Sequence, residues 1–150
     1  MSKVKLDTNL TVLLPLKDRV QYTARFLTYY NAISCPFKVL IADGGNNQEV
    51  RRILRGNTEL SKLHYQYVEY PYDKSLKTYH AKMADIVEKI DTPYTMVMDN
   101  DDFFFINGVY ENMNFLFSNS DYASSRGSVN IFDVDGKVYG NMSVGQCYEK

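Results

Sequence analysis

The chain has no tryptophan, only two cysteines and no long apolar run, and each scarcity excludes a class of protein. Cys35 and Cys147 are far apart and lack partners at metal-site spacing, so we expect structural or incidental thiols. A membrane-spanning helix needs about 20 apolar residues, whereas runs such as Val12 to Leu16 are short. The polar segment Met1 to Asp7 lacks the apolar stretch of a secretory signal. We therefore expect a cytoplasmic protein without a transmembrane segment, at most peripheral to the membrane in a longer chain.

An excess of positive charge is also missing. Lys and Arg number 17 against 18 Asp and Glu, so the formal net charge is −1 and no broad positive field is present to bind nucleic acid. The 45% hydrophobic content is enough for a packed interior and argues against disorder. A length of 150 residues fits one hydrophobic core, so we expect a single domain over residues 1–150.

Strand patterns alternate with helical patterns over the first hundred residues, and both kinds are read from the spacing of apolar side chains. The expected strands are Leu10–Leu16, Phe37–Asp43, Leu63–Glu69 and Tyr94–Met98. The expected helices are one that Asp18 caps and that ends before Pro36, one over Gln48–Arg55 that stops at Gly56, and one over Ser75–Ile90. This alternation predicts an α/β protein, a three-layer α/β/α sandwich with a mostly parallel central sheet.

The third helix and the last third of the chain have their own patterns. The apolar stripe of the helix consists of Leu76, Tyr79, Met83, Ile86, Val87 and Ile90. Beyond Asp102, Asn107–Phe117 favours a helix, and Ile131–Tyr139 favours a hairpin about Asp135-Gly136. No repeat or linker composition marks a domain boundary.

Polar residues follow the expected strands, and ligands of parallel sheets bind outside the carboxyl ends of their strands. The first strand leads into Lys17-Asp18-Arg19, the second ends at Asp43, and the fourth runs into Asp99-Asn100-Asp101-Asp102. Three carboxylates within four residues repel one another, and a divalent cation would relieve that repulsion. Aspartate and asparagine also form turns and helix caps, so a metal site and a structural turn both fit this segment.

Three segments resemble, in order and spacing, the leading signatures of family 2 glycosyltransferases: Leu10–Arg19, Val39–Gly45 and Met96–Asp102. The resemblance covers about Leu10 to Tyr122, and its most specific element is Asp99-Asn100-Asp101, which matches the Asp-x-Asp motif of the family. It implies the glycosyltransferase A type of fold, similar to the nucleotide-diphospho-sugar transferases.

The resemblance also implies a nucleotide-diphosphate sugar as donor, commonly a UDP-sugar, and Mn²⁺ or Mg²⁺ as cofactor. Asp43 matches a residue that contacts the nucleoside, although Gly44 replaces the second acidic residue of that signature and Asn46 its serine. Asp99 and Asp101 match the metal-binding positions. The nucleotide-binding residues that the resemblance implies are Pro15, Leu16, Lys17, Arg19, Asp43, Lys82, Asp99 and Asn100.

Two of these residues also have a purely structural interpretation. Asp43 fits a turn after a strand, and Lys82 fits a solvated lysine on the outer face of an amphipathic helix. His80, next to Ala81-Lys82, is assigned no role.

A general base is not identifiable from the sequence. Inverting transfer needs one to deprotonate the acceptor hydroxyl, and in the family it lies well downstream of the Asp-x-Asp motif. Here Asp121, Asp133 and Asp135 fit turns better. We therefore expect a truncated piece or a shortened homologue that lacks the acceptor-binding part, with an unknown saccharide, lipid or protein as acceptor. An edge left exposed by truncation predicts a homo-oligomer.

The main alternative is a non-catalytic module of the same fold that binds nucleotide or metal without turnover. A phosphoacceptor domain would need an acidic pair after the first strand, where Lys17-Asp18 supplies one acid. A dinucleotide oxidoreductase would need a Gly-x-Gly-x-x-Gly loop where Pro15-Leu16-Lys17 stands.

Overall fold

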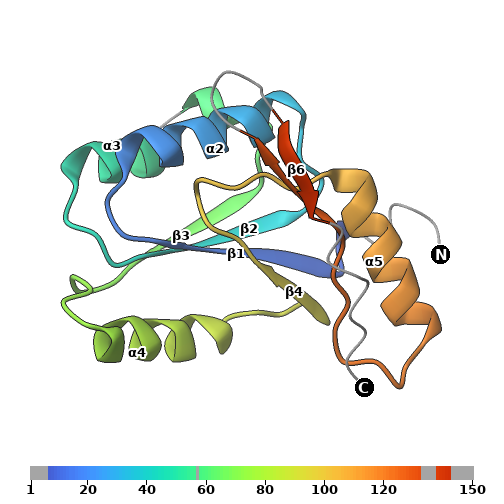
Figure 1. Cartoon of the computed structure of the whole chain (residues 1–150). Helices are drawn as coiled ribbons and strands as arrows, with labels where there is room; N and C mark the ends of the chain where they lie inside the picture. Colours follow the sequence, from blue (N-terminus) through green and yellow to red (C-terminus); the bar gives the residue numbers. More distant parts are fainter. Residues whose placement is uncertain (1–6, 57, 133–137, 143–150) are drawn as a thin grey trace. The chain divides into compact units, whose positions relative to one another are not determined.

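A computed structural model describes residues 7–56, 58–132 and 138–142. Its elements, labelled as in Figure 1, are β1 (Leu10–Leu16), α2 (Val20–Ala32), β2 (Lys38–Asp43), α3 (Gln48–Gly56), the short 3₁₀ helix η1 (Thr58–Leu60), β3 (Tyr65–Glu69), α4 (Leu76–Val87), β4 (Tyr94–Val97), α5 (Ile106–Ser118), β5 (Val129–Phe132) and β6 (Val138–Met142). The chain divides into two compact units, Ser2–Phe103 and Phe104–Lys150 with Met1. The two units are described separately below.

The first unit contains a four-stranded sheet in the order β3-β2-β1-β4, and every pair of neighbours is parallel. The central strands β1 and β2 are almost wholly buried, as their unbroken apolar runs predicted. The outer strands β3 and β4 contain only half-buried and exposed positions. All four predicted strands are confirmed, with ends that differ by no more than two residues.

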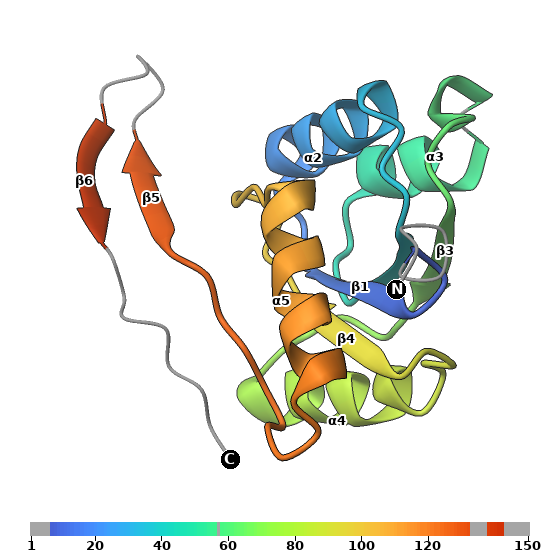
Figure 2. The same cartoon turned by 90° about the vertical axis from the view of Figure 1, so that its right-hand side faces the viewer.

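Helices cover both faces of this sheet, and the α/β class is therefore confirmed. Helices α2 and α3 lie on one face and α4 on the opposite face (Figures 1 and 2). On the α4 side, Ile86 packs in a buried cluster with Leu13, Leu40 and Ala42 of the sheet. Because side chains alternate along a strand, their neighbours in β1 and β2 turn toward α2 and α3.

The beginning of α2 differs from the prediction. Asp18 and Arg19 both have a φ of 59°, in the left-handed region, and the residue before the helix, Arg19, makes no side-chain cap. The Asp18 carboxylate instead accepts hydrogen bonds from the backbone N–H groups of Asn46 and Asn47, at 2.9 and 3.1 Å. The expected cap by Asp18 is thus wrong, because its oxygen is used by the loop after β2.

The buried face of α4 also differs from the predicted stripe. Leu76 and Val87 are exposed, whereas Lys82 and Ile86 are buried. The helix begins with a reciprocal cap between Ser75 and Thr78. The interpretation of Lys82 as a solvated lysine is therefore wrong, because its side chain is directed to the sheet side of α4.

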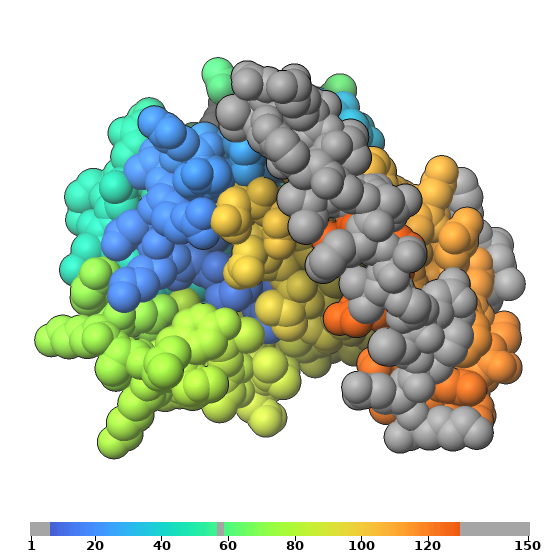
Figure 3. Space-filling view, in the orientation of Figure 1, coloured from blue at the N-terminus to red at the C-terminus, as the bar shows by residue number. Residues whose placement is uncertain are grey.

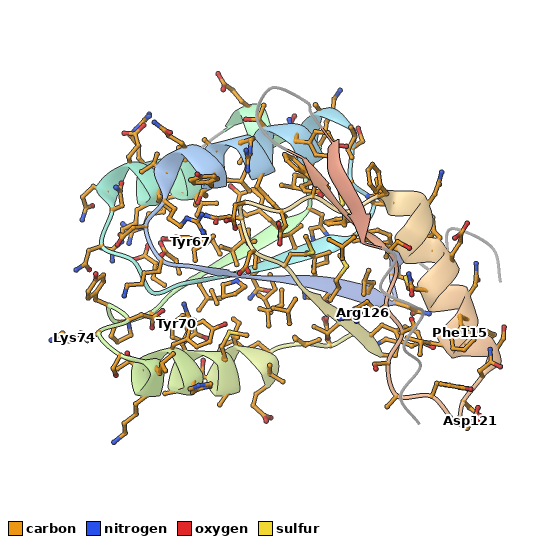
Figure 4. All side chains as sticks on the ribbon, in the orientation of Figure 1. Tyr67, Tyr70, Lys74, Phe115, Asp121 and Arg126 are labelled. Atoms are coloured by element: carbon orange, nitrogen blue, oxygen red, sulfur yellow. The ribbon has the colours of Figure 1, made fainter. Side chains whose placement is uncertain are left out.

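The second unit contains α5 and an antiparallel pair of strands, β5 and β6. Both the helix and the hairpin were predicted, but the turn at Asp135-Gly136 and the candidate residue Asp133 lie outside the described residues. Asp121 lies in the exposed turn after α5 (Figure 4). The rings of Phe115 and Tyr122 meet edge to face.

Two smaller expectations concern membranes and thiols. None of the described helices is long and apolar enough to span a membrane. Cys35 is a buried free thiol, and Cys147 lies outside the described residues.

Candidate functional site

A cavity of about 400 Å³ lies at the carboxyl ends of β1 and β4. The chain steps outward from β1 to β2 and β3, and then crosses to the other side of β1 to form β4. The cavity therefore lies at the topological switch point, where open parallel sheets bind their ligands. Figure 3 shows one face on which the blue β1–α2 region meets the green region of α4. The cavity is lined by Pro15, Leu16, Lys17, Arg19, Asp73, Ser75, Leu76, Tyr79, Lys82, Asp99 and Asn100.

The structure brings together most of the residues that the sequence indicated. Every predicted nucleotide-binding residue except Asp43 lines this cavity. Asp101 of the Asp-x-Asp motif is not among the lining residues, whereas Asp99 is. Segments 83 residues apart in the chain thus meet at one sheet edge, from Leu16 to Asp99.

Lys82 forms a buried ion pair on the cavity wall. Its Nζ donates to Oδ2 of Asp73 at 2.6 Å and to the backbone carbonyl of Leu16 at 3.0 Å. The side chains of Lys82 and Asp73 are 2% and 4% exposed. A buried ammonium is tolerated when it is paired in this way, so Lys82 is a fixed part of the site.

Asp73 is the main residue of the site that the sequence did not indicate. It lies between β3 and α4, outside every predicted strand and helix. Its backbone N–H donates to the carbonyl of Gly44 at 2.8 Å, and its own carbonyl accepts from Nζ of Lys17 at 2.6 Å. The one sequence feature connected with Asp73 is the glycine at position 44, because the absence of a side chain there makes room for the Asp73 carboxylate.

Asp43 is buried behind the site and both of its oxygens are in use. Oδ1 accepts from the backbone N–H of Gly45 at 2.8 Å, and Oδ2 accepts from the Tyr67 hydroxyl at 2.8 Å. Burial first, and then the hydrogen bond to Asp43, raises the pKa of Tyr67 well above its usual range. Tyr67 and Tyr70 lie on opposite faces of the sheet (Figure 4), so only Tyr67 reaches this carboxylate.

Arg19 and Asp101 form an exposed ion pair close to the cavity. The guanidinium donates to Oδ2 of Asp101 at 2.7 Å, and this hydrogen bond holds the pKa of Asp101 below its ordinary value. Arg25 donates to the backbone carbonyl of Asp101 at 2.9 Å. Both arginines lie over the ring of Tyr22, at 4.4 and 5.0 Å. The loop after β4 is therefore attached to the beginning of α2.

The neighbours of Asp101 are held differently. Asn100 is buried and its amide donates to the hydroxyl of Thr23 at 3.0 Å. Asp99 is exposed at the cavity wall. Burial, followed by the negative charges of Asp101 and Asp99, raises the pKa of Asp102. The acidic segment thus carries concentrated negative charge, as its sequence predicted.

The described residues contain no group of three or more His, Cys, Asp or Glu side chains arranged around a metal ion. Asp99 and Asp101 nevertheless supply hard carboxylate oxygens of the kind that Mg²⁺ and Mn²⁺ prefer. The chemistry of the two donors therefore fits a divalent cation.

No protein-family model matches the sequence, and no curated protein matches it significantly.

Proposed function

We propose that this chain binds a nucleotide-diphosphate sugar, with a UDP-sugar as first candidate, in the cavity at the carboxyl ends of β1 and β4. It would act as the donor-binding part of a metal-dependent, inverting glycosyltransferase of the A-type fold. The observation that carries the proposal is the meeting of Lys17 and Lys82 with Asp99 at the switch point of the sheet. The resemblance to family 2 glycosyltransferases supports the same conclusion.

The charge of the cavity wall suits a diphosphate. Lys17, Arg19 and Lys82 provide three cationic groups against the carboxylates of Asp73 and Asp99. Ammonium and guanidinium groups form charge-assisted hydrogen bonds with phosphate oxygens. The volume of about 400 Å³ is within the usual range of small-molecule sites.

Asp99 and Asp101 would hold the divalent cation. When bound, the ion offsets the charge that develops on the leaving nucleotide diphosphate. Arg19 already holds Oδ2 of Asp101, so in this proposal the cation competes with the arginine for that carboxylate.

Asp43 would act at the nucleoside end of the ligand. A carboxylate has about four acceptor positions, and Gly45 and Tyr67 use two of them. Asp43 does not line the cavity. Because it is also buried, its contribution would be to hold the carboxyl end of β2 in place behind the nucleoside end of the site.

Calorimetric titration with UDP, GDP and CDP, each with and without Mn²⁺, tests the proposal. We expect binding that depends on Mn²⁺ and that Asp101→Asn abolishes. The matched control is Asp91→Asn, which removes another exposed carboxylate with a basic partner, Lys38, away from the cavity. A folded chain that binds none of the three nucleotides at millimolar concentration would refute the donor site.

A second candidate function, binding without turnover, is favoured by the acidic residues after Asp102. In the described part of the chain these are Glu111 and Asp121, both in the second unit. Neither of them is identified as a general base. Release of UDP from UDP-sugars in the presence of Mn²⁺ separates the two functions, because a binding module would retain affinity and release none.

A further inference from the structure

Gly44, at the carboxyl end of β2, has the space of its missing side chain filled by another residue. A Cβ atom built on Gly44 would lie 2.3 Å from Oδ2, 2.4 Å from Cγ and 2.7 Å from Oδ1 of Asp73. These are its three nearest neighbours. The backbone of Gly44 is outside the left-handed region, so an ordinary residue could adopt its conformation. The obstacle to a side chain at position 44 is therefore the Asp73 carboxylate.

Asp73 connects three segments at the cavity, through its carboxylate and through both of its backbone groups. Oδ2 accepts from Nζ of Lys82, on α4, at 2.6 Å. The backbone carbonyl of Asp73 accepts from Lys17, after β1, and its N–H binds the carbonyl of Gly44, after β2. Lys17 also lies over the ring of Tyr72, with Nζ 4.9 Å from its centre. One residue thus fixes the positions of two ammonium groups of the cavity wall.

We propose that Asp73 is a positioning residue that holds two lysines toward a diphosphate, Lys82 through its carboxylate and Lys17 through its backbone carbonyl. This inference rests on the proposed function, since a diphosphate is the ligand that the two lysines would bind. Lys82 has three N–H groups, and two of them are used by Asp73 and Leu16. The third has no acceptor within the described residues, and Lys82 lines the cavity.

The incomplete pairing of Asp73 supports a role beyond stability. Its Oδ1 is buried and has no hydrogen-bond partner in the described part of the chain. A buried acceptor without a donor is costly, and well-packed apolar groups often replace a buried ion pair without loss of stability. The carboxylate is explained if its task is to hold Lys82 in place.

Exchanging the carboxylate between the two positions tests the inference. Asp73→Gly removes it, and Gly44→Asp in the same chain supplies it again from β2, into the space that Asp73 has left. The matched control is Gly44→Ala with Asp73→Gly, which restores the Cβ without the carboxylate. Asp73→Asn, which keeps the shape of the side chain, serves if Asp73→Gly does not fold, and thermal melting checks folding of each variant.

Two readouts are needed so that the inference and the proposed function can fail separately. The first is calorimetric affinity for inorganic pyrophosphate and for UDP. The second needs no nucleotide, and is the rate at which acetic anhydride acetylates Lys82, measured by mass spectrometry. In Asp73→Gly we expect affinity to fall at least tenfold and acetylation of Lys82 to accelerate at least tenfold. The Gly44→Asp, Asp73→Gly chain should recover most of both, and the alanine control should recover neither.

Each contrary result has its own meaning. Equal recovery in the aspartate and alanine chains would overturn the inference, because Asp73 would then only fill space. Unchanged acetylation in Asp73→Gly and Asp73→Asn would overturn the positioning of Lys82 even if UDP binds. Binding of pyrophosphate with UDP no tighter would refute the nucleotide proposal and leave the positioning role supported. A wild-type chain that binds neither probe would overturn the diphosphate role, and the acetylation rates would still decide the positioning.

Discussion

Two ion pairs at the cavity have nearly the same geometry but differ in burial, and the difference indicates different roles in a binding site. In the Lys82–Asp73 pair the side chains are 2% and 4% exposed, and in the Arg19–Asp101 pair they are 46% and 38% exposed. The N–O distances, 2.6 and 2.7 Å, are nearly the same. The difference between the pairs therefore lies in their surroundings.

A buried pair cannot exchange its partners for water, because an unpaired charge in the interior is strongly unfavourable. An exposed pair is screened and contributes little to stability, so it can open at small cost. The comparison assigns Lys82 and Asp73 to the fixed wall of the cavity, and Arg19 and Asp101 to its adaptable side. A cation that binds to Asp101 would meet the side that can rearrange.

The largest effect should come from breaking the buried pair. Asp73→Ala leaves the Lys82 ammonium buried and unpaired, and we expect a loss of about 3–5 kcal/mol in the free energy of unfolding. Asp101→Ala breaks the exposed pair and should cost less than about 1 kcal/mol. Urea unfolding followed by circular dichroism measures both, with unchanged dependence on denaturant as the check on two-state behaviour. Similar losses in the two variants would contradict the division between fixed and adaptable sides.

A second test adds an atom to the buried pair. Gly44→Ala places a Cβ atom 2.3 Å from the Asp73 carboxylate, and overpacking of this kind costs about 1–3 kcal/mol. Gly56→Ala is the control, because nothing lies within 4 Å of a Cβ there. It should be neutral or stabilise the protein by up to about 1 kcal/mol. If the two variants melted at the same temperature, position 44 would have free space for a Cβ atom in solution.

The fold was predictable where the signal is local. The apolar runs of Leu10–Leu16 and Phe37–Asp43 indicate strands without reference to anything distant, and both are central strands of the sheet. Asp18 was predicted as a cap from its neighbours alone. Its carboxylate instead binds backbone N–H groups of Asn46 and Asn47, a contact across 28 residues that no local pattern contains.

The residues of the candidate site were likewise predictable only where the signal is local. Lys17 and Asp99 follow strands, so the parallel topology alone predicts that they meet at one edge, and both line the cavity. The burial of Lys82 could not be predicted, because a lysine on an amphipathic helix is normally solvated and the acid that pairs with it, Asp73, comes from another loop. Asp73 can be recognised as a site residue only in the structure, where its carboxylate fills the space beside Gly44.

A smaller effect is expected from the buried amide next to the exposed pair. Thr23→Val keeps the shape of the side chain but removes the hydroxyl that accepts from Asn100. A buried donor without a partner costs about 1–3 kcal/mol, so we expect a loss in that range from urea unfolding. Thr23→Ser keeps the hydroxyl and should lose less. An equal loss in both variants would show that the methyl group, and not the hydrogen bond, is what matters at Thr23.

The smallest effect concerns the ionisation of the exposed pair. Arg19 lowers the pKa of Asp101, chiefly through its hydrogen bond. Because the pKa is lowered in the folded state, the pair stabilises the fold above the ordinary value of 3.8, and this stabilisation is lost as the pH falls through the folded pKa. Arg19→Gln should therefore raise the pKa of Asp101, and carboxyl ¹³C NMR measures it directly.

Neighbouring groups sharpen this last test. Asp101 is one of the charges that raise the pKa of Asp102, after burial, so Asp101→Asn should lower the pKa of Asp102. The control is Lys38→Gln, which should raise the pKa of its partner Asp91 and leave Asp101 unchanged. If Arg19→Gln did not move the pKa of Asp101, the pair would be open in solution, and the carboxylate would be available to a cation without displacement of the arginine. If the pKa rises as expected, cation binding at Asp101 must compete with Arg19, and Arg19→Gln should then strengthen Mn²⁺ binding.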